Sequence, residues 1–186
     1  MNFSKLIDTA EKVSLTLSDK MPDFSKNQDF RMDQVATIKE VNLNPESNID
    51  EISPYSTDIN SEIRSIEELK IYLDSGLEES TVADRPALIR DDIDLEQLDD
   101  DGLTNLERME KGRPPLDKDG KPIELHHIGQ KPDSPLAELT QDEHRGRGNS
   151  AILHDNSSES LIDRQEFQKE KREYWKARAE QIKQGE

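Results

Sequence analysis

The chain has 186 residues, of which 31% are hydrophobic and 36% are charged, and its net charge at pH 7 is −17. This composition predicts one modest domain with a small core, together with a segment too polar to fold by itself. Because the chain has no cysteine, disulfide bonds and thiolate zinc sites are excluded. The sequence has no apolar run long enough to span a membrane, and its first residues lack the apolar stretch of a signal peptide.

The negative charge is unevenly distributed along the chain. Residues 111–186 carry 14 basic and 15 acidic residues, so most of the excess acid lies upstream of residue 111. Acid spread over the whole surface would favour a non-enzymatic regulator or a mimic of nucleic acid. A nearly neutral C-terminal part instead leaves room for a local basic surface that meets phosphate.

The N-terminal part predicts a helix followed by a linker. Apolar residues recur every three or four positions over residues 3–17, which indicates an amphipathic helix that packs on its own domain or binds a partner. Residues 18–60 have little periodicity and are rich in Asp, Asn, Ser and Glu, as in a linker or a disordered segment. We therefore divide the chain into an N-terminal segment, 1–60, with a possible adaptor or delivery role, and a folded domain, 61–186.

The first half of the folded domain predicts a helix and then an extended segment. Residues 61–79 have a helical pattern that ends near Gly76, and Ser65 with Glu68 has the spacing of a capping box. Residues 82–90 form an extended segment. The aspartates that follow it lack the spacing of a calcium loop, so we expect them to be solvated or paired with arginine.

Two further helices are predicted on either side of the histidines. Residues 104–111 form a short helix that starts at the capping pair Thr104 and Glu107. Residues 162–184 form a long charged helix with a partial apolar stripe, in which we expect Trp175 to be a packing anchor.

All four histidines lie between His126 and His154. Residues 115–125 predict a β-hairpin around an Asp-Gly turn, and His126 and His127 end its second strand, where neighbouring side chains point to opposite faces. Residues 136–139 predict another short strand. Thr140 and the glutamate three positions later then start a helix that carries His144. Four histidines placed in this order indicate a site, because imidazole is the commonest metal-ligating side chain.

This order of elements resembles the ββα-metal (His-Me finger) site, and more closely the LHH family of the HNH/endonuclease VII nuclease superfamily. The resemblance is carried by the runs IELHHIGQ, PLAELTQDEHRGRGN and ILH, and it extends over about residues 61–186. It implies an α+β fold with a small ββα-metal core, flanking helices and a partly disordered acidic N-terminal segment. It also implies a metal-dependent endonuclease that hydrolyses phosphodiester bonds.

The resemblance assigns roles residue by residue. His126, His144 and His154 match ligands of one divalent metal ion, and His127 matches the general base that deprotonates the attacking water. The loop after His144 is longer than in compact relatives, so Asn149 is an alternative third ligand. An imidazole-rich set suits Zn or Ni better than Mg or Mn, although ligand type alone does not fix the metal used in the cell.

Glu124 and Arg145 complete the expected site. Glu124 lies two residues before His126 on the same face of the strand, where it can hold the second ring nitrogen of that histidine or orient an arginine. Arg145 and Arg147 can contact phosphate, and the alternative for both is ordinary charge at a helix end.

The resemblance further implies a bacterial toxin or effector that acts on double-stranded DNA and has a cognate immunity protein. Such a protein is made in the bacterial cytoplasm, delivered without a cleaved signal peptide, possibly through residues 1–60, and acts in the target-cell cytoplasm. Two rivals stay open: an RNase toxin with the same site, and a non-enzymatic acidic protein that mimics nucleic acid or regulates a partner. A structural metal site is a third, but it would need a fourth protein ligand.

Overall fold

The computed structural model describes residues 48–146, 148–155, 157 and 161–185. The helix predicted over residues 3–17 and most of the predicted linker lie outside these residues. In chain order the elements are α3 (Ile49–Ile52), α4 (Thr57–Asn60), α5 (Ile66–Asp74), β1 (Glu78–Val82), β2 (Arg85–Ile89), α6 (Asn105–Glu110), β3 (Glu124–His127), the 3₁₀ helix η2 (Ile128–Gln130), β4 (Leu136–Leu139), α7 (Gln141–Arg145), α8 (Asn149–Leu153) and α9 (Arg164–Gln184). The expected mixed α+β fold is confirmed.

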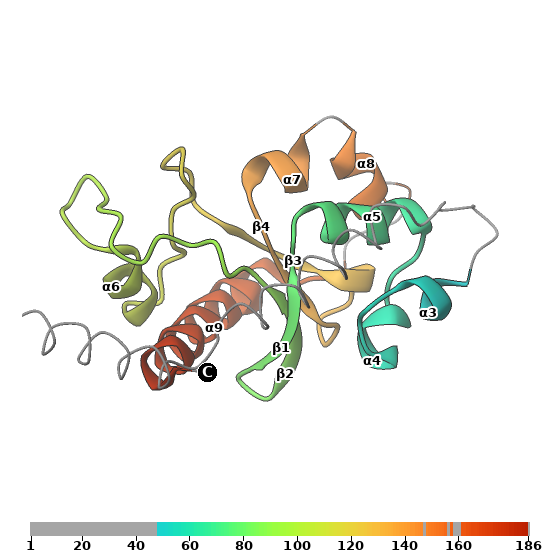
Figure 1. Ribbon diagram of the computed structural model, residues 1–186, viewed down its shortest axis with the longest axis horizontal. Helices are drawn as coiled ribbons and strands as arrows, with labels where there is room; N and C mark the ends of the chain where they lie inside the picture. The colour runs from blue at the N-terminus through green and yellow to red at the C-terminus, as the bar shows by residue number, and fades with distance from the viewer. Residues whose placement is uncertain (1–47, 147, 156, 158–160, 186) are drawn as a thin grey trace, which may run out of the picture. The chain divides into compact units, whose positions relative to one another are not determined.

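The strands form one small mixed sheet in the order β1-β2-β4-β3 (Figure 1). β1 and β2 are antiparallel, β2 and β4 are parallel, and β3 is antiparallel to β4. β3 is therefore an edge strand of this sheet. Together with β4 and α7, which follow it in the chain, β3 forms the ββα unit expected of an HNH-type nuclease core.

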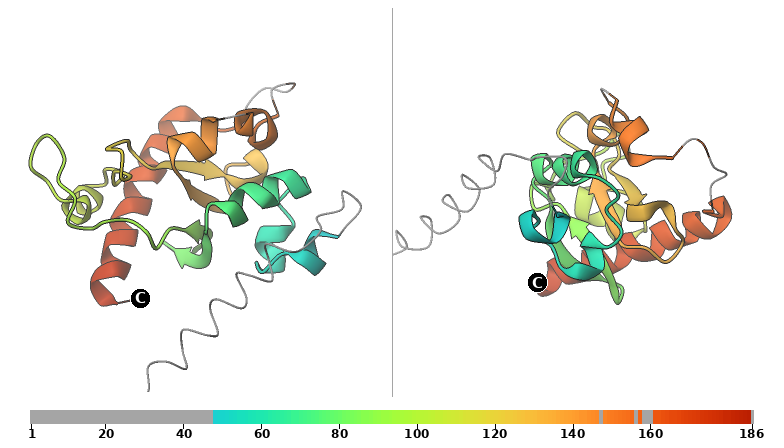
Figure 2. Two further views of the ribbon diagram at one scale, coloured as in Figure 1. Left: turned by 45° about the horizontal axis from the view of Figure 1, so that its top comes forward. Right: turned by 90° about the vertical axis from the view of Figure 1, so that its right-hand side faces the viewer.

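Helices cover both faces of the sheet (Figure 2). On one face, residues of β2 and β4 pack with α4, α5 and the end of α8, whereas on the other face the sheet packs with α6 and α9. The alternation of a strand divides β4 between the two cores, since Ala137 and Leu139 enter the first and Leu136 enters the second. The same alternation separates His126 from His127.

Local sequence signals account for the elements near the histidines. Thr104 and Thr140 each accept a hydrogen bond from the backbone three residues on, and the glutamate at that position caps the helix start in return. Two of the three predicted capping boxes are thus confirmed. The predicted strand over residues 136–139 matches β4. Trp175 is 1% exposed within the second core, as a packing anchor should be.

Two predicted elements differ from the structure upstream of the site. The helix predicted over residues 61–79 is only α5, and Glu68 accepts from the backbone of Arg64 instead of closing a capping box with Ser65. The single extended segment predicted over residues 82–90 is wrong, because a tight turn splits it into β1 and β2. Ala83 and Asp84 form that turn with φ values of 52° and 61°. A turn with two positive φ values normally carries Gly, Asn or Asp at both positions, and the alanine at position 83 does not fit that pattern.

Residues 48–60 fold, although the sequence suggested a linker there. Ile59 of α4 is fully buried, and Asn60 donates a hydrogen bond to the carbonyl of Tyr55 (2.9 Å). The hairpin predicted over residues 115–125 is reduced to one antiparallel bridge, Leu116 with Pro122, and β3 pairs with β4 instead. Within the described residues, no helix combines the length and the apolar character that crossing a membrane requires.

Candidate metal centre

Three histidines from three elements come together on one face of β3. His126 comes from β3, His144 from α7, and His154 directly follows α8. Their ring centroids are 4.9–5.1 Å apart, and each ring offers one nitrogen within 4.8 Å of the others. The capping box of α7 and the short helix α8 fix the two histidines that face the strand.

The outer ring nitrogens of two of these histidines are held by oxygen acceptors. Nδ1 of His144 lies 2.7 Å from a carboxylate oxygen of Glu124, and Nδ1 of His154 lies 3.0 Å from the carbonyl oxygen of Ser150. A carbonyl or a carboxylate accepts hydrogen bonds, so in both rings Nδ1 is the donor. In a neutral ring the other nitrogen, Nε2, then carries the lone pair.

The Nε2 atoms of His144 and His154 face each other, and neither carries a proton when both rings are neutral with Nδ1 as the donor. Nε2 of His144 lies 3.2 Å from Nε2 of His154, and burial lowers the pKa of His144, which opposes protonation of that ring. Burial and the neighbouring rings also hold the pKa of His126 well below its usual value, and its buried Nε2 has no hydrogen-bond partner in the described part of the chain. Converging lone pairs in a buried site fit a bound cation.

The donor set fits a transition-metal ion. Tetrahedral zinc with Zn–N bonds of about 2.0–2.1 Å places its nitrogen ligands about 3.3 Å apart, close to the 3.2 Å between His144 and His154. Three imidazoles leave further coordination positions unfilled by this group, as in a catalytic site.

Glu124 connects the histidine group to an arginine. One carboxylate oxygen accepts from both Nδ1 of His144 and Nε of Arg145 (2.8 Å), and the other lies 2.5 Å from the terminal nitrogen of Arg145. Sequence reasoning offered His126 or an arginine as its partner. The structure gives it the arginine, and the histidine that it holds is His144. The Arg145 side chain remains largely exposed at the end of α7.

The alternative ligand Asn149 has a different contact. Its amide donates to the carbonyl of Glu143 (2.8 Å) and so ties the start of α8 to α7. His154, rather than Asn149, is part of the group of converging imidazoles. Arg147 lies outside the described residues.

His127 points to the opposite face of β3, toward α9. Its ring centroid is 4.5 Å from that of Phe167, and its Nε2 lies 3.1 Å from a carboxylate oxygen of Glu170 without the geometry of a hydrogen bond. Glu170 also pairs with Arg85. The His127 side chain is 4% exposed, so a ring expected to be free for substrate is covered in this structure.

The surroundings of His127 keep its ring neutral. Burial, reinforced by the positive charge of Arg85, lowers its pKa to about 4, although a hydrogen bond to the backbone of Pro132 acts in the opposite direction. At neutral pH the ring is therefore unprotonated, and one of its nitrogens has a free lone pair. It borders a hollow of about 360 Å³ that lies between β2, the loop before β4 and the first turns of α9.

Sequence reasoning did not find three of the contacts around these histidines. The contact of Glu170 with His127 and the stacking of Phe167 depend on how α9 docks, for which the sequence has no local signal. The acceptor for His154 is the backbone carbonyl of Ser150, which no residue type reveals. The only hint in the sequence is the spacing: Ser150 lies four residues before His154, and His154 directly follows a short helix.

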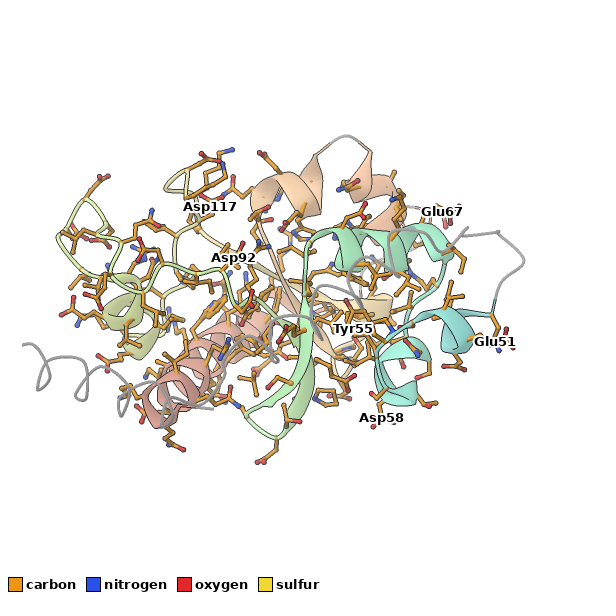
Figure 3. The ribbon with its side chains drawn as sticks, viewed as in Figure 1. Glu51, Tyr55, Asp58, Glu67, Asp92 and Asp117 are labelled. Carbon is orange, nitrogen blue, oxygen red and sulfur yellow. The ribbon has the colours of Figure 1, made fainter. Side chains whose placement is uncertain are left out.

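A larger hollow lies elsewhere and is acidic. Asp92 and Asp117, labelled in Figure 3, line a space of about 670 Å³ together with four more carboxylates, Asp94, Asp119, Asp142 and Glu143. The cations that line it are Arg90 and Lys118, and Arg90 is already paired with Asp92 and Glu143. The pairing of Asp92 with arginine agrees with the sequence expectation. A surface of this charge would repel phosphate, so it is a poor candidate for substrate binding.

Comparison with known proteins agrees with this site. The family model LHH, described as a nuclease of the HNH/ENDO VII superfamily with conserved LHH, matches residues 104–181, and Leu125, His126 and His127 supply that motif in β3. No solved structure matches the chain. The matched segment runs from the N-cap of α6 into α9 and contains all four histidines. Over residues 104–181 the chain therefore matches a family of nucleases of the HNH/ENDO VII superfamily, which supports a nuclease of that superfamily.

Proposed function

We propose that the chain is a metal-dependent endonuclease that hydrolyses DNA. One divalent cation is held by His126, His144 and His154, and Glu124 fixes the orientation of His144. The observation that carries this proposal is the pair of facing Nε2 atoms, 3.2 Å apart, beside a third imidazole whose buried Nε2 has no hydrogen-bond partner among the described residues. When bound, the ion supplies Lewis-acid stabilisation of the charge that develops on the phosphate and the leaving oxygen.

In this proposal His127 is the general base. Its neutral ring takes a proton from the attacking water at Nε2, and Arg145, held by Glu124, binds a phosphate oxygen of the substrate. Because Phe167 and Glu170 cover the ring, the water reaches Nε2 only after these side chains move aside. Both histidines belong to an edge strand, so a phosphate at that edge can meet groups from both faces of the sheet.

DNA is favoured by the superfamily. The all-imidazole set favours Zn or Ni over Mg or Mn, because nitrogen donors suit the former pair and oxygen donors the latter.

The test is cleavage of plasmid DNA and of a structured RNA by the full chain, with each divalent ion added in turn after removal of metal. We expect the wild-type protein to cut DNA with at least one ion and His127→Ala to lose at least a hundredfold in rate, since general-base catalysis contributes about 10²–10⁴-fold. His127→Ala should still bind metal. Cleavage of RNA alone would move the assignment to a ribonuclease, and activity of the variant equal to wild type would refute the role of His127.

We propose also that this nuclease acts as a bacterial toxin or effector with a cognate immunity protein, with residues 1–60 in delivery. This part rests on the resemblance of the histidine motifs to toxin domains. Expression in a bacterial cytoplasm should halt growth, and His127→Ala should relieve the toxicity. Equal growth with both proteins, at equal expression, would argue against a toxic role.

A further inference from the structure

Two cationic side chains, from opposite faces of the sheet, approach the edge strand β3. Arg145 reaches it from α7 on the face of the histidine group, where it pairs with Glu124. Lys171 approaches from α9 on the face of His127. Lys171 is one of many charged residues in its helix, and no sequence pattern distinguishes it from the others.

Lys171 is held beside the proposed base by an aromatic ring. Its ammonium nitrogen lies 4.3 Å from the centroid of Phe167, and the same ring lies 4.5 Å from the ring of His127. A cation over an aromatic face is attracted by the ring quadrupole, so this contact fixes an otherwise mobile side chain. Phe167 is thereby both a cover for His127 and a support for Lys171.

This lysine is half-buried, yet in the described part of the chain its ammonium group makes no hydrogen bond or ion pair and contacts only the Phe167 ring as a cation–π pair. The partly buried Arg85 and Arg90, by contrast, are both paired with carboxylates. Removing a cation from water without an anion is unfavourable, so such a group is well placed to take a charge from a ligand.

Lys171 interacts electrostatically with charged and titratable groups on both faces of β3. Burial lowers its pKa, the Glu124 carboxylate raises it, and the positive charge of Arg145 lowers it. Lys171 in turn contributes to the lowered pKa of His127. Arg145 and Lys171 together carry two positive charges against the one negative charge of Glu124, in a chain whose net charge is −17.

We propose that Lys171 binds the substrate phosphate at the edge of β3, on the His127 side, while Arg145 binds it from the side of the histidine group. This inference rests on the proposed nuclease function and names a further substrate contact for it. At this edge Arg145 and Lys171 would supply the positive charge for a phosphate, while Arg85 already offsets the Glu170 carboxylate beside His127.

The test compares DNA binding and cleavage by the full chain and three variants. Lys171→Ala removes the charge, Lys171→Arg keeps it, and Lys176→Ala removes an exposed charge from the same helix but from a different face. Binding to a fluorescently labelled DNA duplex is measured by anisotropy in EDTA, where no metal-dependent cleavage occurs, over a range of salt concentrations. Single-turnover cleavage is measured with the activating metal.

We expect Lys171→Ala to weaken binding and to reduce the slope of log K against log salt by about 0.9, the value for one lost phosphate contact on duplex DNA. Cleavage should fall by about tenfold or more. Lys171→Arg should restore the slope, and Lys176→Ala should resemble wild type. Melting temperatures of the variants show whether a loss reflects unfolding instead.

The outcomes separate this inference from the proposed function. A wild-type protein that cuts DNA, with Lys171→Ala matching Lys176→Ala in slope and rate, overturns the role of Lys171 alone. If Lys171→Ala reduces the slope of log K against log salt and Lys171→Arg does not restore it, a phosphate contact through the charge of Lys171 is likewise contradicted. A wild-type protein that neither binds nor cuts nucleic acid overturns both proposals.

Discussion

At the scale of single residues, Glu124 is the point where the parts of the site meet. Its carboxylate accepts from His144 and Arg145 at once, and it contributes to the charge balance around Lys171. A carboxylate behind a ligating imidazole fixes the ring and makes its inner nitrogen a better donor to metal. Glu124 is therefore a positioning residue for the proposed ligand and for the proposed phosphate contact together.

Glu124→Gln should weaken metal binding by about 10–100-fold, because a neutral amide holds the Nδ1–H group of His144 less strongly than a carboxylate. Titration of Zn²⁺ into the metal-free protein by calorimetry measures this. Asp142→Asn is the matched control, since Asp142 also lies in α7 but is exposed and makes only a long contact with Lys121 (3.4 Å). Equal affinities for the two variants would contradict the role of Glu124.

Part of the site could be predicted from the sequence at this scale. The alternation of β3 correctly separated His126 from His127, because it depends on the local geometry of a strand. Glu124 was correctly expected on the face of His126, but its histidine partner is His144, since that choice depends on how α7 docks. The contact of His127 with Glu170 depends on the docking of α9 and leaves no pattern in the sequence.

At the scale of elements, α9 decides what surrounds His127 and Lys171. The helix is anchored to the sheet by Glu138 of β4, which is 0% exposed. Its carboxylate accepts from the hydroxyl of Tyr174 (2.8 Å) and from the backbone of Arg90 (2.9 Å), and it lies 3.4 Å from Nε of Arg178. These contacts fix the register of α9 and hence the positions of its upstream turns.

Glu138→Ala should lower the free energy of unfolding by about 3–5 kcal/mol, because it leaves the buried guanidinium of Arg178 without its carboxylate. Chemical denaturation followed by tryptophan fluorescence measures the change, since Trp175 lies in the same helix. Glu180→Ala removes an exposed carboxylate of α9, and we expect a loss below about 1 kcal/mol. A loss as small as this for Glu138→Ala would mean that Glu138 does not anchor the helix.

The elements themselves differed in how well the sequence predicted them. β4, α6 and α7 were found because alternation and capping boxes are local signals. The turn at Ala83 and Asp84 was missed because alanine is not typical of a turn position with positive φ and no glycine accompanies Asp84. The folded segment at residues 48–60 was missed because its helices have only four residues each, which is too short for a periodic pattern.

At the scale of the whole domain, residues upstream of the matched family segment complete its core. Tyr72 of α5 and Leu88 of β2 pack with Ala137 and Leu139 of β4. Arg64 donates to the side chain of Gln130 (2.8 Å) and to the carbonyl of Ile152 (3.0 Å), so it ties the upstream part to the helix that precedes His154. The arrangement of the three histidines thus depends on residues that the family match does not include.

A fragment of residues 104–186 should therefore fail to fold, whereas residues 48–186 should fold and bind metal. The shorter fragment lacks β2, the parallel partner of β4, and leaves one face of the sheet uncovered. Thermal unfolding followed by circular dichroism distinguishes the two, with a cooperative transition expected only for the longer fragment. A cooperative transition in the shorter fragment would show that the upstream segment is dispensable for the fold.

Calorimetric titration of divalent metal into the metal-free full chain shows whether three imidazoles jointly hold one ion. We expect one ion per chain for wild type, with loss of most of the affinity on His126→Ala, His144→Ala or His154→Ala. His127→Ala and Asn149→Ala should bind as wild type does. A wild-type chain that binds no ion, or wild-type affinity in the first three variants, would contradict joint ligation by these histidines.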